Sequence, residues 1–502
     1  MRGKTVIEKI RNIKTEWKLA WVTTVVLGLL IHMPVLLGDY PNHDGLASMY
    51  FDQNMITSGR WFLTVACGFS SYFTLPWLIG ILSLCFLGVG AAALVSFLGI
   101  QKESHVVLVS ALLVSFPALA STYAYIFTAD GYMLALAMIL VDLYVTKTYR
   151  FGFVWGGILI AFSMGCYQSY LAFAMILAIY GVWQIYLEEK KGFWKESLHY
   201  VYMGVLGVAL YYVILRILLL VEGKQLSSYQ GIEDMTETAK VSFSQQLLHI
   251  YRDFLGFAGN GRVLMQNLLG AGCMLVLLGF ALWSLGKAGM LKKWQTYVLT
   301  FVSIVAFPIC ANMILLVSPG VTYHLLMRYQ YVLIPILLLA LIDRQDMGKW
   351  QSIAAFMAGI LVLQYAVADN IAYSNLQKKY EKTYGYCLRL LDRMEQTEGY
   401  ETGMPVAMVG VINTEHYPKT DLTGKVTDSM IGMNGDFLVY TDDNYQSFFA
   451  NYLGATIELV DDEKMEEIYH SAIYQAMPSF PENGCTQVVD GILYVKTEPC
   501  AK

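Results

Sequence analysis

Long apolar segments separated by short polar stretches fill the first three quarters of the chain. A helix needs about 20 apolar residues to cross a bilayer, and by this measure the pattern predicts about eleven membrane-spanning helices. The predicted spans lie near residues 17–37, 76–99, 106–127, 131–147, 151–166, 169–187, 198–221, 267–286, 295–318, 329–343 and 350–368. The fourth, fifth and tenth are short for a straight span. Residues 1–368 are therefore expected to form an all-α polytopic membrane domain.

The pattern changes after residue 368. Apolar positions at helical spacing between 371 and 394 predict an amphipathic helix that continues the last span. Residues 404–412 have the pattern of a buried strand and 462–477 that of a helix, while 486–496 predict a hairpin that turns at Asp490-Gly491. Residues 369–502 are expected to form a small α/β domain.

The composition agrees with a membrane protein. Of the 502 residues, 56% are hydrophobic and 15% are charged, whereas soluble domains carry about 25% charged residues. The formal net charge of -5 is concentrated in loops and in the C-terminal region. There is no polybasic tract and no nucleic-acid-binding motif, which argues against a DNA or RNA partner.

Lysine and arginine are distributed unequally between alternate loops, and this asymmetry predicts the orientation. The N-terminus is basic and leads into an apolar run without a signal-peptide cleavage site, so we expect an uncleaved first helix that starts in the cytoplasm. An odd number of spans then places the C-terminal domain outside the cytoplasm. The same orientation gives two long outer loops, over 38–75 and 222–266.

The second outer loop contains a further helical pattern. The apolar side chains at 247, 248, 251, 254 and 255 recur at helical spacing, which predicts an amphipathic helix. It would lie on the outer leaflet of the membrane or pack on the helical bundle, and the sequence leaves both arrangements open.

The eight cysteines are scattered, without CxxC or zinc-ligand spacing. Five of them lie in or beside apolar segments and are expected to be packing residues. Cys485 and Cys500 lie in the C-terminal domain, where a disulfide between them would be permitted outside the cytoplasm. The sequence does not decide whether they pair.

The first outer loop begins with an acidic segment, Gly-Asp-Tyr-Pro-Asn-His-Asp-Gly at 38–45. Carboxylates at a lipid boundary are costly to dehydrate, so Asp39 and Asp44 are candidates for a functional role. A carboxylate in this position is suited to act as a general base toward a hydroxyl group. One histidine, His43, beside two acids is weak evidence for a metal site, and no metal is expected.

Other polar residues fall at the outer ends of predicted spans. Asp130, Tyr167 and Gln168 lie at two outer turns. Asp39, Asp44, Asp130, Gln168 and Arg328 all map to outer helix ends, where their segments would be able to converge on one cavity. The alternative for Asp130 is a helix cap. Three arginines at the same level are candidates to bind a phosphate, because guanidinium keeps its charge and presents paired donors. They are Arg60, Arg216 and Arg328.

Two of these arginines have different alternatives. Arg216 lies within a predicted span, and its alternatives are extension to the lipid headgroups or an ion pair with Glu222. Arg328 opens a predicted helix, where a positive charge opposes the helix dipole. A specific anionic partner is therefore expected for Arg328.

With these residues in view, the chain resembles the Gtr-type membrane glucosyltransferases, the family of serotype-converting O-antigen glucosyltransferases. The likeness rests on the acidic segment at 40–45, Ser58-Gly59-Arg60-Trp61, the pair Tyr167-Gln168, Arg328 and the hairpin around Asp490-Gly491. It covers most of the chain, but each motif is short.

The resemblance implies a GT-C-like helical bundle with its active site on the extracytoplasmic face. It also implies a polyprenyl-phosphate-linked sugar, typically glucose, as donor and a cell-surface glycan as acceptor, without a cofactor. Carried over to this chain, the catalytic carboxylate is Asp44, with Asp39 second. His43, Asp130, Tyr167 and Gln168 are then expected to bind substrate, and the three arginines the donor phosphate.

A transporter or flippase of lipid-linked sugars is the main alternative, since it would bind the same molecules. Such a protein would show ionisable residues near the membrane midplane or helices broken by glycine and proline. A non-catalytic membrane scaffold, without a cavity at the outer face, is a third interpretation. Polar residues gather mainly at the outer ends of the spans, which favours chemistry on one face.

Overall fold

The computed structural model describes residues 13–47, 55–70, 74–189, 192–227, 242–259, 261–318, 320–412, 424–428 and 430–498. The chain divides into two compact units. The membrane unit comprises Met1–Leu37 and Asp52–Asn370, and the C-terminal unit comprises Gly38–Phe51 and Ile371–Lys502. The acidic segment that follows the first span thus belongs to the C-terminal unit.

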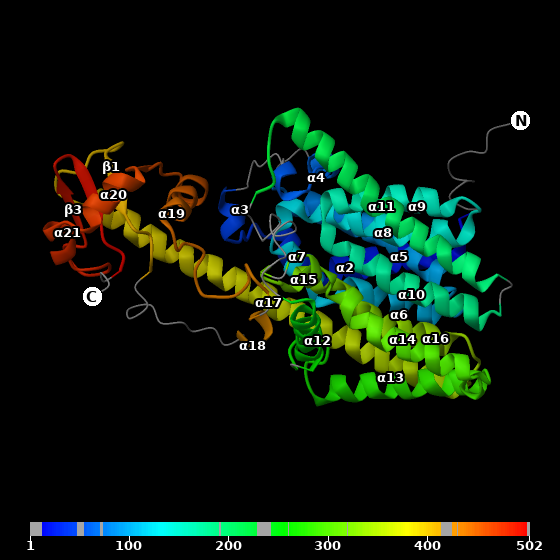
Figure 1. Ribbon diagram of the computed structural model, residues 1–502. Helices are drawn as coiled ribbons and strands as arrows, with labels where there is room; N and C mark the ends of the chain where they lie inside the picture. Colours follow the sequence, from blue (N-terminus) through cyan, green and yellow to red (C-terminus); the bar gives the residue numbers. More distant parts are fainter. Residues whose placement is uncertain are drawn as a thin grey trace, which may run out of the picture. The chain divides into compact units, whose positions relative to one another are not determined.

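The membrane unit is a bundle of helices (Figure 1). Its elements are α2 (Thr15–Leu37), η1 (Ile56–Ser58), α4 (Leu63–Cys67), η2 (Gly68–Ser70), α5 (Pro76–Leu98), α6 (Glu103–Ser115), α7 (Pro117–Tyr123), η3 (Ile126–Thr128), α8 (Ala129–Thr148), α9 (Gly152–Cys166), η4 (Gln168–Tyr170), α10 (Leu171–Leu187), α11 (Phe193–Glu222), α12 (Phe243–Gly259), α13 (Leu268–Lys287), η8 (Met290–Lys292), α14 (Trp294–Ala311), α15 (Met313–Val317), η9 (Leu325–Val332), α16 (Leu333–Asp343) and the first part of α17 (Lys349–Glu395).

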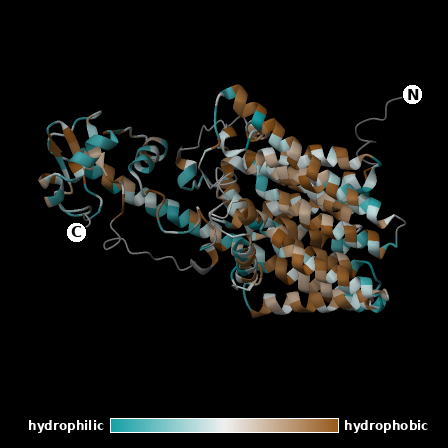
Figure 2. Cartoon of the chain, in the orientation of Figure 1, coloured by the Kyte–Doolittle hydropathy of each residue, from teal (hydrophilic) through white to brown (hydrophobic). Residues whose placement is uncertain are grey.

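The prediction of a helical polytopic membrane protein is confirmed. Over the described residues, nine helices are long and apolar enough to cross a membrane, or ten if the bent pair α6 and α7 forms one span. The apolar helix α9 has 15 residues and coincides with the fifth predicted segment. Hydrophobic residues dominate the bundle helices in Figure 2.

Local sequence explains where these helices begin and bend. Pro76 opens α5, where its missing N–H costs no hydrogen bond, and Gly99 ends the same helix in a left-handed conformation. Pro117 cannot donate a backbone hydrogen bond within a continuous helix, so α6 and α7 meet at an angle of 43°. The third predicted span is therefore bent, as a broken span or a re-entrant loop would be.

The bundle is built outward from α5 and α8. Helix α5 packs between α2 and α8, α8 packs against α9, and α9 packs against α11. Two polar residues near the ends of predicted spans, Asp142 and Gln184, are buried within this packing. Gln184 is satisfied there, because its amide donates to the carbonyl groups of Phe97 and Leu98 at the end of α5.

The C-terminal unit combines short helices with a four-stranded sheet. Its elements are α3 (His43–Ala47), the last part of α17, β1 (Pro405–Met408), α18 (Gly424–Thr427), α19 (Asp442–Phe448), η10 (Phe449–Leu453), β2 (Glu458–Leu459), α20 (Asp462–Tyr469), α21 (Ala472–Ala476), β3 (Thr486–Val489) and β4 (Ile492–Val495). The strand order is β2-β1-β4-β3. Strand β1 is parallel to both of its neighbours, and β3 and β4 are antiparallel.

The predicted α/β elements of this unit are present. The β3–β4 hairpin turns at Asp490 and Gly491, both with positive φ, as a two-residue hairpin turn requires. The predicted helix at 462–477 is divided into α20 and α21, because Ser471 caps the second helix by accepting a hydrogen bond from the backbone N–H of Tyr474. Cys500 lies outside the described residues, so the possible disulfide stays a prediction.

The acidic segment is anchored in the C-terminal unit by Leu46. Its side chain belongs to a buried cluster that includes Leu390, Met408 and Phe448. The backbone carbonyl of Leu46 also accepts a hydrogen bond of 3.0 Å from Asn451 Nδ2. One apolar side chain thus fixes the position of the three candidate residues Asp39, His43 and Asp44 within this unit.

Candidate functional site

The membrane unit brings three predicted site residues together in what we call the Arg60 cluster, which consists of Arg60, Tyr132, Tyr167, Gln168 and Tyr211. Arg60 Nη1 donates to the Tyr132 hydroxyl at 3.1 Å. The Arg60 guanidinium also lies 5.4 Å from the centre of the Tyr167 ring. The rings of Tyr132 and Tyr167 are stacked with their centres 4.3 Å apart. The arginine is thus oriented by two aromatic side chains from different helix ends.

The second half of the Arg60 cluster holds the turn that carries Arg60. Gln168 Nε2 donates to the Ser58 carbonyl at 3.0 Å and to the Tyr211 hydroxyl at 3.1 Å. The Tyr211 hydroxyl in turn donates to the Gly59 carbonyl at 3.1 Å. The motif Ser58-Gly59-Arg60 and the pair Tyr167-Gln168, far apart in the sequence, therefore form one hydrogen-bonded group. This contact supports the expectation that these residues act together.

Gly59 is required by this geometry. Its φ is +75°, and a Cβ at this position would lie 2.5 Å from the Tyr211 hydroxyl and 2.6 Å from Gln168 Nε2. We expect Gly59→Ala to destabilise the protein by about 1–3 kcal/mol, because left-handed strain and the lost Gln168 contacts add. Thermal unfolding in detergent measures the change. Gly204→Ala is the matched control, since a Cβ there meets nothing within 4 Å; an equal loss in both variants would contradict this role of Gly59.

Asp130 lies two residues before Tyr132 at the start of α8 and is completely buried. Its Oδ1 accepts the backbone N–H of Gly131 at 2.9 Å. Among the described residues, Oδ2 has no hydrogen-bond partner. The N-cap of α8 is Thr128, which makes no side-chain capping bond. Asp130 instead lies within the first turn, where its side chain satisfies one of the free backbone N–H groups of the helix, so its structural alternative remains. A buried carboxylate at the same helix end as Tyr132, with one oxygen that has no hydrogen-bond partner within the described residues, is consistent with a substrate-binding role.

Arg328 lies elsewhere in the membrane unit and already has an anionic partner. Its Nη1 and Nη2 donate to Oδ2 and Oδ1 of Asp253 on α12 at 2.6 and 2.8 Å. The guanidinium lies 3.8 Å from the centre of the Tyr323 ring. The expectation of a specific anionic partner for Arg328 is confirmed, and this partner is a carboxylate of the protein.

The same ion pair shows how the amphipathic helix of the second outer loop is attached to the bundle. Helix α12 is held to the bundle by Asp253, and the Tyr251 hydroxyl donates to the Val305 carbonyl at 2.7 Å. Phe243, Leu248 and Leu255 on the same helix are exposed. The predicted amphipathic helix is therefore packed on the bundle with part of its apolar surface uncovered.

Arg216 is exposed on α11 and contacts its neighbour one turn earlier. Its Nε donates to the Tyr212 hydroxyl at 2.8 Å. The alternative ion pair with Glu222 is wrong, because the carboxylate of Glu222 lies 2.8 Å from Lys224 Nζ. Tyr211, adjacent to Tyr212, faces inward to the Arg60 cluster, so Arg216 lies on the opposite side of α11.

In the C-terminal unit, the acidic segment forms a compact turn followed by α3. The side chain of Asn42 is buried and accepts the backbone N–H of Gly45 at 2.7 Å. His43 Nε2 lies 3.3 Å from Asp44 Oδ1, and the His43 ring lies 5.6 Å from the ring of Tyr440. Burial lowers the pKa of His43, and the negative charge of Asp44 opposes this shift. A neutral His43 at pH 7 follows, beside an exposed carboxylate.

Asp39 occupies a more aromatic environment than Asp44. Its Oδ2 accepts a hydrogen bond of 3.4 Å from the Tyr452 hydroxyl. Burial of the carboxyl group raises the pKa of Asp39, although the bond from Tyr452 acts in the other direction. The two acids therefore differ in their contacts: Asp39 accepts a hydrogen bond from Tyr452, whereas Asp44 lies beside His43.

The predicted residues thus form two groups and two outliers. Arg60, Tyr167 and Gln168 are in direct or shared contact in the membrane unit, at the end of α8 where Asp130 also lies. Asp39, His43 and Asp44 gather in the C-terminal unit. Arg328 and Arg216 belong to neither group. Within the described residues, no group of three or more His, Cys, Asp and Glu side chains could hold a metal ion.

Sequence reasoning missed several residues that the structure places in these networks. Tyr132 lies at the same predicted turn as Asp130, but its contact with Arg60 was not foreseen. Tyr211 is one of 35 tyrosines, and only its position against Gly59 and Gln168 distinguishes it. Asp253 was not chosen from the sequence, although an acid within the amphipathic pattern of the second outer loop could have pointed to it. Asp369 is completely buried, and neither carboxylate oxygen has a partner among the described residues. Its signal was an acid at the end of an apolar span.

Comparisons with known proteins add one finding. The family model described as Glucosyl transferase GtrII matches residues 33–341. A comparison with curated proteins and one with solved structures each found no match. The matched range includes the acidic segment, the whole Arg60 cluster, and the ion pair of Arg328 with Asp253.

Proposed function

Because the chain belongs to the GtrII glucosyl transferase family, we propose that it transfers glucose from a polyprenyl-phosphate donor to a cell-surface glycan. Its family and its apolar helices identify the protein as a multi-pass membrane glucosyltransferase. The donor, the acceptor and the extracytoplasmic location of the reaction are proposed. The observation that best supports them is the Arg60 cluster, which orients a cation at the end of a helical bundle.

Arg60 is the best-supported ligand for the donor phosphate. Its side chain is half-buried, donates to the Tyr132 hydroxyl and lies beside the Tyr167 ring, so little side-chain freedom would be lost when a phosphate binds. Arg328 is a weaker candidate because its paired donors meet Asp253. Arg216, exposed on α11, would contact a phosphate only at the lipid-facing surface.

The proposed reaction needs one base and one stabilised leaving group. The carboxylate of Asp44, or of Asp39, accepts the proton of an acceptor hydroxyl. The acceptor oxygen then forms a bond to the anomeric carbon of glucose, while the bond from that carbon to the phosphate oxygen breaks with inversion. The polyprenyl phosphate leaves with the electron pair, and Arg60 stabilises its negative charge.

The remaining candidates have binding roles in this scheme. Gln168 holds the turn that carries Arg60, and Tyr167 supports the guanidinium face. Asp130 presents an unused carboxylate oxygen that would accept a sugar hydroxyl. His43 would orient Asp44 and contact the acceptor. No cofactor is part of the proposal, because the phosphate ester of the donor is already an activated leaving group.

The distribution of basic residues supports the proposed orientation. The positive-inside rule applied to this chain places the N-terminus in the cytoplasm and the acidic segment outside it. A lipid-linked donor would then enter laterally from the outer leaflet. The number of apolar helices indicates a multi-pass membrane protein, and its location at the cell membrane is part of the proposal.

A transfer assay tests the proposal. The full chain is reconstituted in liposomes with polyprenyl-phosphate [14C]glucose and the surface glycan, and radioactivity in the glycan is measured. We expect transfer that depends on the lipid-linked donor and is absent with nucleotide-linked glucose alone. Transfer from the nucleotide-linked sugar, without the lipid, would contradict the proposed donor.

Two buried carboxylates support the transporter alternative. Asp142 on α8 and Asp369 on α17 are completely buried, and none of their oxygens has a hydrogen-bond partner within the described part of the chain. Ionisable residues inside membrane helices are typical of transporters. Movement of a fluorescent polyprenyl-phosphate sugar across the bilayer of proteoliposomes, without any glycan product, would favour this alternative.

A further inference from the structure

A basic cavity lies at the end of the membrane unit remote from Asp130. It is lined by residues at the end of α8, in the turn to α9 and at the start of α11, and its volume is about 400 Å³. Thr146 in its wall is 16 residues beyond Asp130 on α8, which corresponds to about 24 Å along the helix. The cavity is therefore separate from the Arg60 cluster.

Three cationic side chains from three elements line this cavity, namely Lys147, Arg150 and Lys195. The one acidic residue in its wall, Glu196, has its Oε2 3.8 Å from His199 Nδ1. His199 is stacked on Phe153 with the ring centres 5.3 Å apart. The acid is thus turned toward a neighbouring imidazole, and the lining carries an excess of positive charge.

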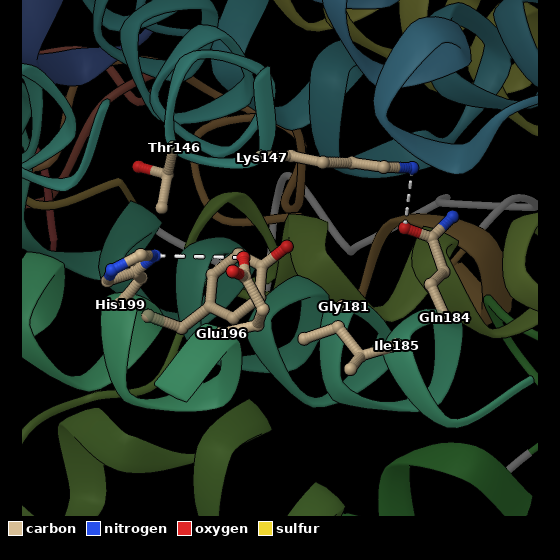
Figure 3. A pocket seen from close by; sticks show the side chains of 8 residues that line it. Thr146, Lys147, Gly181, Gln184, Ile185, Glu196 and His199 are labelled. Carbon is tan, nitrogen blue, oxygen red and sulfur yellow. Dashed lines mark hydrogen bonds and ion pairs between the residues drawn. The ribbon is translucent and has the colours of Figure 1, made fainter. Parts of the chain in front are cut away.

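Figure 3 shows the narrow inner recess of the same region, which shares Thr146, Lys147, Glu196 and His199 with the larger cavity. Lys147 Nζ donates to Gln184 Oε1 at 2.9 Å and to the Phe97 carbonyl at 2.7 Å. The ammonium group therefore binds a backbone carbonyl in the last turn of α5, and its charge is held in position. Arg150 and Lys195 are exposed and are able to move toward a ligand.

The rim of the cavity indicates the kind of ligand. Tyr149 and Phe151 in its wall, and Trp155 and Trp194 on the adjoining helices, are all more than half exposed. Exposed aromatic side chains at the ends of membrane helices mark the level of the lipid headgroups. A ligand at this level would place a phosphate among the three cations and its hydrocarbon chains beside the aromatic rings.

We propose that this cavity binds the headgroup of an anionic phospholipid. The volume is in the range of small-ligand sites, the charge is complementary to a phosphodiester, and the aromatic rim is suited to a lipid. A soluble phosphate would use the same cations but would gain nothing from the rim. The inference holds for whichever sugar donor the enzyme uses.

Lipid binding by the purified full chain tests this inference. The protein in nanodiscs of phosphatidylcholine with 10–20% phosphatidylglycerol, on the order of physiological anionic content, is analysed by native mass spectrometry for retained phosphatidylglycerol. We expect Arg150→Gln/Lys195→Gln to weaken its retention about thirty-fold, because two cations are removed from the headgroup level. The control Lys292→Gln/Lys349→Gln removes two exposed charges outside the cavity and should retain wild-type binding.

Three outcomes would overturn the proposal. Equal losses in the cavity and control variants would indicate a general surface charge effect. Equal retention of phosphatidylglycerol and phosphatidylcholine by the wild-type protein would show that the cavity does not select a negative headgroup. Full displacement of the lipid by millimolar inorganic phosphate would indicate a site for the free anion. Thermal unfolding of both variants verifies that they remain folded.

Discussion

Asp44→Asn is expected to lower the rate of glucosyl transfer by about 10²–10⁴-fold, the contribution typical of a general base. The amide has nearly the shape of the carboxylate but cannot accept a proton from the acceptor hydroxyl. Asp44 is exposed and lies beside His43, which burial keeps neutral at pH 7. The rate is measured under saturating donor and acceptor, so that the loss falls on kcat.

Asp39→Asn is the informative comparison. Asp39 accepts a hydrogen bond from the Tyr452 hydroxyl, and the side-chain oxygen of an asparagine would be able to accept the same bond. We expect this variant to lose less than ten-fold. Asp443→Asn, an exposed acid on α19 of the same unit, controls for surface charge. If Asp39→Asn loses more activity than Asp44→Asn, the base is Asp39, and near wild-type rates in both variants would remove the acidic segment from the chemistry.

The membrane helices were predictable from the sequence because one physical rule, the thickness of the bilayer, governs their length. Length and apolarity alone locate the membrane helices, because the bilayer sets their minimum length. The turn at Asp490-Gly491 was predictable for the same kind of reason, since two residues with positive φ are needed there. The bend at Pro117 was not foreseen, because the apolar pattern continues across it.

Contacts between distant segments were only partly predictable. Arg60, Tyr167 and Gln168 were chosen from position and type, and their shared network depends on Tyr132 and Tyr211, which no local pattern distinguishes. The buried position of Asp142 was not predictable from its place in the sequence. It lies close to the end of a predicted span, but the packing of neighbouring helices covers it completely.

Nothing in the sequence indicated that the acidic segment belongs to the C-terminal unit. Residues 38–51 follow the first span directly, so they were predicted as part of a membrane-domain loop. Leu46 is the cause of the observed grouping, since its side chain belongs to the apolar core formed with residues more than 340 positions later. A single leucine in a polar segment does not reveal which core it enters.

Removal of one partner of the Arg328–Asp253 pair is expected to destabilise the membrane unit by about 3–5 kcal/mol, because a buried charge is left without compensation. Both side chains are largely buried, with 10% and 20% of their surface exposed. Asp253 also accepts a hydrogen bond of 2.9 Å from Asn312. Asp253→Leu therefore breaks several contacts between α12 and the bundle, and unfolding in detergent or limited proteolysis of α12 measures the loss.

The double variant Arg328→Met/Asp253→Leu separates stability from phosphate binding. An apolar pair of similar volume should recover most of the lost stability, since no unpaired charge remains. If Arg328 only holds α12 in place, transfer activity recovers with stability. If Arg328 also binds the donor phosphate, the double variant is stable but keeps a raised KM for the lipid-linked donor. A double variant no more stable than Asp253→Leu would contradict the argument that the unpaired arginine causes the loss.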